Sequence, residues 1–368
     1  DRRGAGGAVA GAQVVGADDK VFVRVDALAR AAGREPSDVR LDCLVKPEDM
    51  PFNNITGKHF DSGNYIECVQ RAVAAIDLKA VRQRQQQPEP DGRLIGLGMS
   101  IFCEQSAHGT SVYAGWGIPM VPGHEQAVVR LTPDGTLEVR VGIHSHGQGL
   151  ETTLAQVAEE VLGIDTDQVQ VVHGDTALTP YSTGTWGSRC MVMAGGAVAR
   201  ACTALASRIA LIGAHLLEVP AESVKVQDGV VCSSETSGTV TLQDVARVWY
   251  LKPQLLPDNV DSGGLEVTVG YKPQRDSGTF SYACHAVVVA VDPELGTTEI
   301  LDYAIVEDGG VLVNPMIVDG QIHGGIAQGV GQALWESGEY NESGQLVSGS
   351  MMDYAIPRTD CLPNFELD

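Results

Sequence analysis

The spacing of apolar residues along the chain predicts a series of helices. In each of them apolar side chains recur every three or four residues, which places them on one face of an α-helix. The first helix is ended by Gly33, a residue suited to the left-handed turn that closes many helices. The predicted helices cover residues 25–32, 64–85, 150–163, 195–216, 241–250 and 320–336.

Alternating apolar and polar residues predict strands, most of them in hairpins. The turn sequences TPDG, QDG, DPELG and NESG separate the apolar stretches after residue 94. Because hairpins interleave with helices, we expect an α+β fold of layered mixed sheets and helices rather than a doubly wound parallel sheet. The polar, proline-containing segment 83–94 predicts a linker between a first domain, residues 1–82, and a second domain, residues 95–368.

Two parts of the sequence repeat the same order of predicted elements. Each has two strands, a tight turn and a helix that opens with Gly-Gln, at Gln148 and at Gln321. A second glutamine follows in each helix, at Gln156 and Gln328. Two interpretations remain open: two ordinary β-β-α units, or a pseudo-repeat whose helix N-termini face one shared ligand.

The overall charge restricts the ligands that the chain can bind. Lys and Arg number 25 against 47 Asp and Glu, which gives a net charge of −22. Such a field repels phosphate backbones and argues against nucleic-acid binding. An anionic ligand must therefore be held by local backbone groups.

The cysteines indicate a reducing compartment. Eight cysteines are scattered without a CxxC pair, which is typical of free thiols in the cytoplasm. No uninterrupted apolar run reaches the length of a membrane span, and no signal peptide opens the chain. The sequence starts without Met, and we expect it to be part of a longer protein.

Three histidines are candidates for a metal site. His144 and His146 are two residues apart, so on a strand they share a face, and His173 with Asp175 would complete a ligand set. That set would make the protein a histidine-based metallohydrolase. His-x-His also arises by chance, and packing within a loop remains the alternative.

The segment GIHSHGQGLETTL is a candidate anion site, because it joins a predicted strand to a helix N-terminus. A helix N-terminus presents unpaired N–H groups and the positive end of the helix dipole. Gly147 and Gly149 would let a ligand approach the backbone closely, and the amide of Gln148 can both donate and accept hydrogen bonds. A glycine-rich structural turn is the alternative.

A second candidate segment, YSTGTWGSRCMVM, precedes another helix. Ser188 and the backbone near Arg189 and Cys190 would hydrogen-bond an oxyanion, unless the segment is only a capping turn. Cys190 has no neighbouring base in the sequence, so we do not expect it to act as a nucleophile. The sequence has no G-x-S-x-G, no P-loop and no GxGxxG after a strand, so it gives no support for hydrolase, NTPase or dinucleotide-binding folds.

Five motifs together resemble a known family. HGQGLETTLAQVAEEVLG, VVHGDT, GTWGSR, NPMIVDGQIHGGIAQGVGQALWE and GSMMDYAIP occur in that order. They look like the molybdenum-binding large subunit of the xanthine dehydrogenase, aldehyde oxidase and CO dehydrogenase family, over Val21–Asp368. The resemblance implies that the first domain is the C-terminal part of one molybdopterin-binding domain and the second a truncated further one.

The resemblance also implies a molybdopterin cofactor, expected as the cytosine dinucleotide, and residues that bind it. It implies no direct protein ligand to the metal. The sequence RRGAG resembles the family's active-site loop, with Arg3 as a catalytic candidate, and the general-base glutamate is expected beyond Asp368. The implied cofactor-binding residues are Gly147, Gln148, Gly149, Gly187, Ser188, Arg189, Cys190 and Gln321.

Departures from the family pattern narrow the substrate. Gly4 stands where CO-oxidising members carry a copper-binding cysteine, which disfavours CO. Ala5 lacks the aromatic ring that purine-oxidising members use, which disfavours xanthine. Cys190 stands where similar members often have serine, and residues 7–25 fit the pattern poorly, as a frameshifted segment would.

The implied activity is hydroxylation of an aldehyde or of an N-heterocyclic carbon, with water as the oxygen donor. Electrons would leave through two-iron two-sulfur clusters and FAD on partner subunits or domains, in a dimer of heterotrimers. We expect a cytoplasmic location, although periplasmic members of the family exist. A truncated remnant that binds no cofactor is the main alternative.

Overall fold

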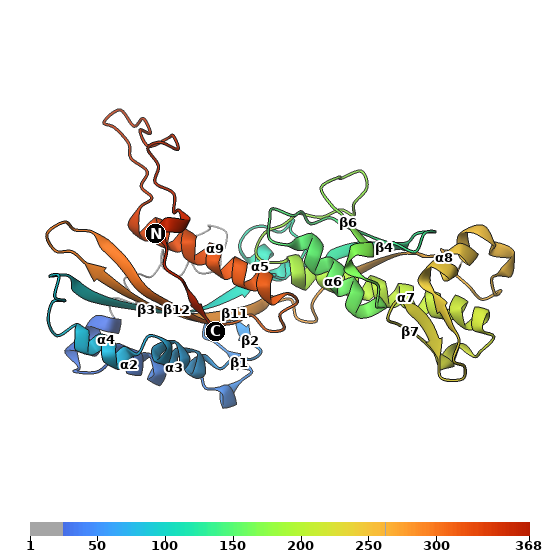
Figure 1. Ribbon diagram of the computed structural model, residues 1–368, viewed down its shortest axis with the longest axis horizontal. Coiled ribbons are helices and arrows are strands. Elements are labelled where there is room, and N and C mark those ends of the chain that lie inside the picture. The colour runs from blue at the N-terminus through green and yellow to red at the C-terminus, as the bar shows by residue number, and fades with distance from the viewer. Residues whose placement is uncertain (1–24, 262) are drawn as a thin grey trace. The chain divides into compact units, whose positions relative to one another are not determined.

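The structure, a computed structural model, describes residues 25–261 and 263–368 as two compact units. Within that range, unit 1 comprises residues 25–105 and 280–368, and unit 2 comprises the residues between 106 and 279. Each unit has a mixed four-stranded sheet with packed helices, which confirms the predicted α+β class (Figure 1).

The two units do not follow the division predicted from the sequence. The expected linker, 83–94, lies inside unit 1 and joins α4 (Leu78–Arg84) to β3 (Leu94–Ser106). The side chain of Gln85 donates to the carbonyl of Ile95 at 3.2 Å, so the segment is fastened to the strand that follows it. Its polar, proline-containing sequence is that of a surface turn within one unit.

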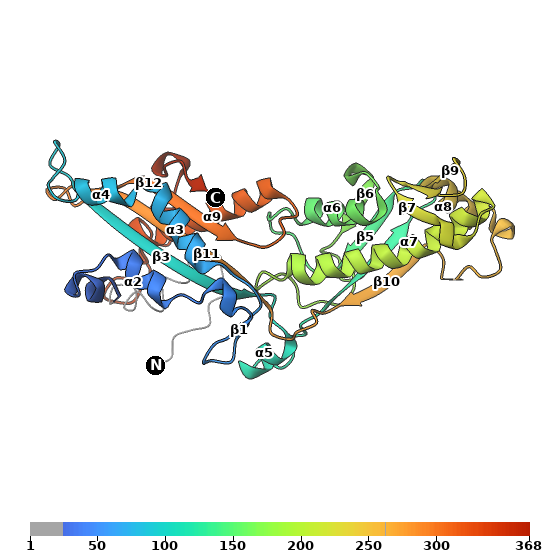
Figure 2. The ribbon, with the colours of Figure 1, turned by 90° about the horizontal axis from the view of Figure 1, so that it is seen from below.

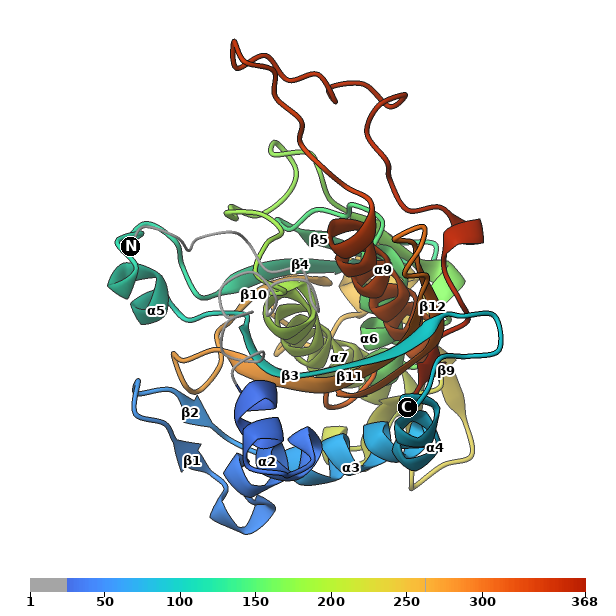
Figure 3. The same ribbon diagram turned by 90° about the vertical axis from the view of Figure 1, so that its left-hand side faces the viewer.

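The sheet of unit 1 has the order β13-β12-β11-β3. β11 and β12 form an antiparallel hairpin, and β13 joins β12 in parallel. Helices α2, α3 and α4 cover one face and α9 the other, as Figure 3 shows end-on. The remaining bounds are β11 (Thr279–Val291), β12 (Thr298–Asp308), β13 (Glu366–Leu367), α2 (Pro36–Cys43), α3 (Tyr65–Ala75), α9 (Pro315–Leu334) and the small hairpin β1 (Phe52–Asn53) with β2 (His59–Phe60).

Each face of this sheet has its own apolar core, because strand side chains alternate between faces. Toward α3, Val69 packs with Cys284 and Ala286 of β11. Toward α9, Ile326 and Val330 pack with Phe102, Tyr303 and Ile305. Unit 1 is therefore a three-layer arrangement of helices, sheet and helix.

Helix boundaries in unit 1 depend on single residues. The helix predicted over 64–85 is broken, because Asp77 adopts a left-handed backbone (φ 44°) and its side chain accepts from Ala80 N to start α4. The structure confirms the first helix, over 25–31, and adds α2, which the sequence analysis missed. α9 begins at Pro315, five residues before the predicted start, because the Asn314 side chain accepts from Ile317 N.

The main sheet of unit 2 has the order β10-β4-β5-β6 and is covered by α6 and α7 (Figure 2). β4 and β5 form an antiparallel hairpin around the predicted 132–135 turn, and β6 joins β5 in parallel. The bounds are β4 (Glu125–Leu131), β5 (Leu137–Val141), β6 (Val169–Val172), β10 (Glu266–Tyr271), α5 (Thr110–Gly115), α6 (Leu150–Leu162), α7 (Gly196–Leu217), α8 (Leu242–Leu251), and a three-stranded sheet of β7 (Val224–Gln227), β8 (Val230–Ser233) and β9 (Thr239–Thr241).

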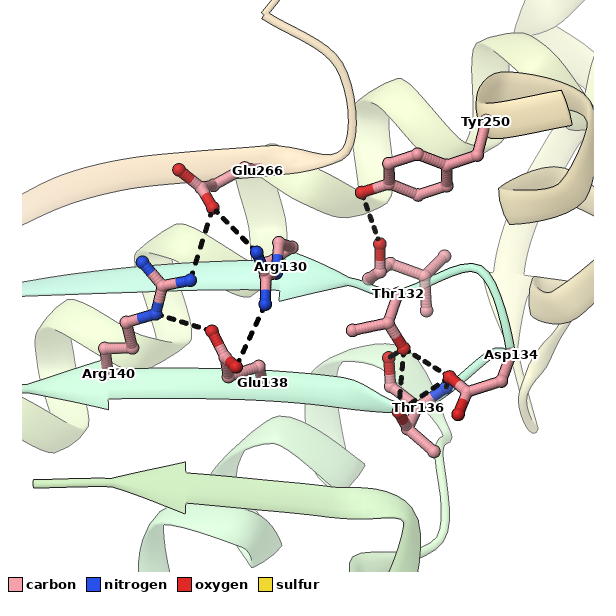
Figure 4. Close-up of polar contacts among 9 residues, drawn as sticks. Arg130, Thr132, Asp134, Thr136, Glu138, Arg140, Tyr250 and Glu266 are labelled. Atoms are coloured by element: carbon pink, nitrogen blue, oxygen red, sulfur yellow. Dashed lines mark hydrogen bonds and ion pairs between the residues drawn. The ribbon is translucent and has the colours of Figure 1, made fainter. Parts of the chain in front are cut away.

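The two faces of the unit 2 sheet differ sharply in polarity. The inward side chains, such as Val129 and Val139, are fully buried beneath α6 and α7. On the outward face Arg130 and Arg140 both bond Glu138, at 3.0 and 2.5 Å, and approach Glu266 (Figure 4). Period-two alternation thus fixes which face packs, and the outer charges keep that face solvated.

The longest apolar helix in the described residues belongs to the core of unit 2. A π-helical turn, Cys190–Gly195, runs into α7, and together they are long and apolar enough to cross a membrane by length and composition. Yet Ala197, Leu205 and Ile209 have no exposed surface. We therefore interpret this segment as a core helix.

The two parts of the sequence with the same order of predicted elements also share a topology in the structure. β4–β5–α6–β6 in unit 2 and β11–β12–α9–β13 in unit 1 each consist of a hairpin, a helix and a strand parallel to the second hairpin strand. The helix starts differ, however. Gln148 precedes α6, whereas Gln321 is the seventh residue of α9, so the expectation that both helices open with Gly-Gln is wrong for α9.

Candidate functional site

The loop 142–149 links β5 to α6 and depends on its glycines. Gly147 has φ 103° and Gly149 has φ 76°, conformations that residues with a side chain rarely adopt. Gly149 is the residue before α6, and no side chain caps this helix end. The first N–H groups of α6 are thus left without the Ser, Thr, Asp or Asn cap that most helices have.

The amide of Gln148 holds this loop together. Its Oε1 accepts from the backbone N–H of His146 at 2.8 Å, and its Nε2 donates to the carbonyl of His144 at 3.4 Å. The same Nε2 lies 3.7 Å from Cys190 Sγ in the second predicted segment. We expected this amide to face a ligand, and the structure instead engages it within the loop.

The second predicted segment, 181–190, lies beside this loop. The hydroxyl of Thr185 accepts from His144 N at 2.8 Å and donates to His144 O at 2.6 Å. Gly187 (φ 57°) and Ser188 (φ 53°) follow in left-handed conformations. The left-handed Ser188 is followed by Arg189 in a right-handed conformation (φ −92°), and such a pair turns successive backbone N–H groups to one side, a geometry that suits an anion. Thr185 is a site residue that the sequence analysis missed.

Arg189 does not face the candidate site. Its side chain has no exposed surface, and its guanidinium donates to Glu125 Oε1 at 2.5 Å. It also donates to the carbonyls of Gly184, at 3.0 Å, and His124, at 2.9 Å. Its side chain is therefore a structural anchor for the segment, and only its backbone remains available to a ligand.

Cys190 begins the π-helical turn and is half-buried. Burial raises the pKa of its thiol above the ordinary value, although hydrogen bonds with Thr185 and Gln148 act in the opposite direction. A raised pKa leaves less thiolate at neutral pH, which agrees with the prediction that Cys190 is not a nucleophile.

Two of the three candidate histidines, His144 and His173, form a hydrogen-bonded chain with Glu151. His144 Nδ1 and His173 Nδ1 are 3.0 Å apart, and His173 Nε2 lies 2.8 Å from Glu151 Oε1. The described residues contain no group of three or more His, Cys, Asp or Glu side chains placed to hold a metal ion. Asp175 instead accepts from Ala177 N in a turn. The metallohydrolase alternative therefore lacks its metal centre.

Glu151 is the functional candidate that the sequence analysis passed over. Its own backbone N–H, in the first turn of α6, and then His173 donate to its carboxylate, and both lower the pKa of Glu151. The signal was present in the sequence as an acidic residue in the first helical turn, where carboxylates are favoured.

Gln321 and Arg3 do not belong to the described part of unit 2. Gln321 lies on α9 in unit 1 with its side chain exposed, whereas the other described candidates lie in unit 2. Arg3 falls outside the described residues. The candidate site in unit 2 thus consists of the loop 142–149 and the segment 181–190.

This arrangement fits an anionic ligand with hydrogen-bonding edges. The start of α6 offers uncapped N–H groups, and the left-handed turn at Gly187 and Ser188 offers more. Two buried hydroxyls, Thr183 Oγ1 within the segment and Tyr113 Oη beside Gly187, have no hydrogen-bond partner within the described part of the chain. Tyr113 Oη would lie 3.3 Å from a Cβ at Gly187.

Comparison with known proteins identifies the family to which the chain belongs. Residues 71–363 match the family model of the molybdopterin cofactor-binding domain. The chain belongs to this family. It is 35% identical over 346 residues to the nicotine 6-hydroxylase large subunit of Paenarthrobacter nicotinovorans, an alignment that covers 93% of this chain and 41% of that protein.

Further relatives confirm the resemblance to molybdenum hydroxylase large subunits. The carbon monoxide dehydrogenase large chain of Hydrogenophaga pseudoflava is 31% identical over 94% of this chain and 42% of its own. The crystal structure of quinoline 2-oxidoreductase from Pseudomonas putida 86 superposes with a TM-score of 0.85, at 34% identity, over 94% of this chain and 44% of that one. The chain thus spans about two fifths of the curated relatives it matches.

Proposed function

We propose that this chain is the cofactor-binding part of a molybdenum hydroxylase that oxidises an N-heterocyclic carbon with water as the oxygen donor. The family match over residues 71–363 carries this proposal. The backbone geometry of the loop 142–149 and the segment 181–190 supports it, because no side chain caps the start of α6 and because Gly187 and Ser188 have left-handed conformations. Molybdopterin, proposed as its cytosine dinucleotide, brings anionic phosphate to the backbone N–H groups of these segments.

The residues of unit 2 bind and orient in this proposal. The start of α6 and the turn at Gly187 and Ser188 would hold the anionic part of the cofactor through backbone N–H groups. Gln148 fixes the conformation of the loop 142–149, and Thr185 bonds this loop to the segment 181–190. The bound cofactor supplies the redox chemistry, and the protein supplies its position and electrostatics.

An N-heterocycle is favoured over the other substrates of the family. The nicotine hydroxylase and quinoline oxidoreductase relatives are both named for N-heterocycles, and both are more similar in sequence than the CO dehydrogenase relative. Gly4 in the sequence also replaces the cysteine expected of CO-oxidising members. An aldehyde is the alternative substrate.

The proposal includes partners and a location. We place iron–sulfur and FAD groups on partner subunits or domains, in a dimer of heterotrimers, on the strength of the family resemblance. The relatives named as large subunits or large chains support the presence of partner subunits. Arg3 and Gln321 stay in the proposal as active-site and cofactor-binding residues on the strength of the family resemblance. A cytoplasmic location is supported by the cysteines, all eight of which are free thiols.

The decisive experiment isolates the natural protein that contains this sequence, together with its partner subunits. We expect stoichiometric molybdenum with a pterin nucleotide, and substrate-dependent reduction of an electron acceptor by nicotine, pyridine or quinoline. Oxygen from ¹⁸O-labelled water should enter the product. Turnover of benzaldehyde alone would select the aldehyde alternative, and a folded protein without molybdenum would identify a remnant and reject the proposal.

A further inference from the structure

A buried ion pair lies behind the candidate site in unit 2. The side chain of Arg189 is 0% exposed and that of Glu125 is 1% exposed. Arg189 donates to Glu125 Oε1 at 2.5 Å, and Ser182 Oγ lies at the same distance from that oxygen. Neither charged group faces solvent, so the pair has no direct contact with a ligand.

This pair fastens the segment 181–190 to the start of β4. The guanidinium reaches the carbonyls of Pro122 and His124 just before β4, and the carbonyl of Gly184 in the segment. Glu125 is itself the first residue of β4. One planar group with several fixed donors therefore sets the distance between a sheet strand and the segment.

The segment in turn positions the loop 142–149. Thr185 exchanges two hydrogen bonds with the backbone of His144, and Cys190 Sγ lies within 3.7 Å of Gln148 Nε2. A displacement of the segment would thus move the loop at the start of α6. Both halves of the candidate site are connected to β4 through Arg189.

Stability alone does not account for this pair. Replacing a buried ion pair by apolar side chains of similar volume is often neutral or stabilising, because the desolvation penalty disappears. Here Glu125 Oε2 and Arg189 Nε also make no hydrogen bond with any described residue. The pair is costly to bury, and two of its polar atoms lack hydrogen bonds. Its presence is therefore better explained by the single conformation that it imposes on the surrounding chain.

We propose that Glu125 is a positioning residue, which acts through Arg189 to fix both segments of the cofactor site. The carboxylate neutralises the buried guanidinium and orients its donors toward Gly184 and His124. The site would then hold its cofactor tightly only while the pair is intact. This inference rests on the proposed function, since the ligand in question is the molybdenum cofactor.

The test replaces both partners in the natural protein, produced with its partner subunits. The double variant Glu125→Leu with Arg189→Met keeps volume and leaves no unpaired charge, so it should fold. Its melting temperature should fall modestly, because the carbonyls of Gly184 and His124 lose their donor. We expect its molybdenum and pterin content per chain to fall about tenfold, equivalent to 1.4 kcal/mol of binding. Amide exchange over 142–149 should also quicken about tenfold in the cofactor-free protein, by the same conversion.

A matched control separates positioning from general packing. Arg208 also joins a helix of unit 2 to a neighbouring segment, through the carbonyl of Gly264 at 2.7 Å and the carboxylate of Asp261 at 2.6 Å. Arg208→Met should leave the molybdenum content and the exchange of residues 142–149 unchanged. A purely structural role for Arg189 would give the two arginines the same profile.

The outcomes distinguish this inference from the proposed function. Wild-type molybdenum content and unchanged loop exchange in the double variant would overturn the positioning role while leaving the proposed function intact. A wild-type protein without molybdenum would reject the proposed function, and the exchange measurement would still decide the positioning role. If the double variant does not fold, Arg189→Lys keeps the charge without the planar fork, and normal molybdenum content in it overturns the inference.

Discussion

The hairpin–helix–strand motifs of the two units share a topology and differ at the start of the helix. In unit 1, α9 is capped by the Asn314 side chain and has Pro315 at its first position, so one N–H is satisfied and another is absent. In unit 2, α6 follows the left-handed Gly149 without any side-chain cap. Of these two helices, α6 is therefore the one whose first N–H groups remain available for an anion. The exception is the N–H of Glu151, which donates to the carboxylate of the same residue.

This difference shows that a repeated topology does not repeat a binding site. The glutamines that the sequence aligns have different structural roles, since Gln148 braces a loop and Gln321 lies on the exposed side of a helix turn. What distinguishes the two helix starts is the cap, which is a local property of one or two residues. The predictions below separate the two motifs experimentally.

The hairpin turns should respond very differently to an added methyl group. Gly296 turns β11 into β12 with φ 70° and open space around it, so Gly296→Ala should cost about 1–2 kcal/mol from the left-handed backbone alone. Gly135 turns β4 into β5 with φ 91°, and a Cβ there would lie 2.9 Å from Gln243 Cβ. Gly135→Ala should lose about 1–3 kcal/mol more from overpacking, measured by urea unfolding. Equal losses would contradict this account.

Acid should weaken unit 1 more than unit 2. Burial lowers the pKa of His285 in β11 to about 4, whereas the corresponding strands of unit 2, β4 and β5, contain no histidine. The unfolded chain, with a histidine pKa near 6.5, binds a proton first, so stability is lost as pH falls from about 6.5 to 4. The full effect is about 3 kcal/mol. His285→Phe should flatten the melting temperature across this range, and parallel profiles would refute the assignment.

Replacing each of the two aligned glutamines by alanine should have different effects. Gln148→Ala removes the brace of the loop 142–149, and a displacement of about 1 Å at a reacting site can cost about a hundredfold in turnover. Its molybdenum content should fall as well. Gln321→Ala removes an exposed side chain and should leave the melting temperature unchanged. Normal molybdenum content and turnover in Gln148→Ala would show that the loop does not serve the cofactor.

Local signals in the sequence predicted much of this fold. The hairpin turns at 132–135 and 292–296, the helix ends at Gly33 and Gly163 and the glycines of the loop 142–149 follow from backbone conformations that few residues tolerate. The break at Asp77 and the early start of α9 were missed, because each depends on one side chain that caps a helix. Apolar periodicity does not reveal such caps.

The contacts that hold the candidate site together could not be predicted from sequence patterns. Arg189 and Glu125 are 64 residues apart, and nothing local to either predicts that they meet. Thr185 and His144 are likewise 41 residues apart. The sequence thus indicated which segments form the site, whereas the contacts that hold them together arise only when the strands and loops pack.

Removing the cap of α9 and adding one to α6 should change stability least, and it compares the two helix starts most directly. Asn314→Ala removes the acceptor for Ile317 N and should lower the free energy of unfolding by about 1 kcal/mol, measured by urea unfolding. Gly149→Asn should do the reverse at α6, because asparagine tolerates the left-handed conformation and its side chain can cap the helix. That cap would occupy the N–H groups offered to the cofactor, so molybdenum content should fall although the protein gains stability. A Gly149→Asn protein that is more stable and still fully loaded would place the anion of the cofactor somewhere other than the start of α6.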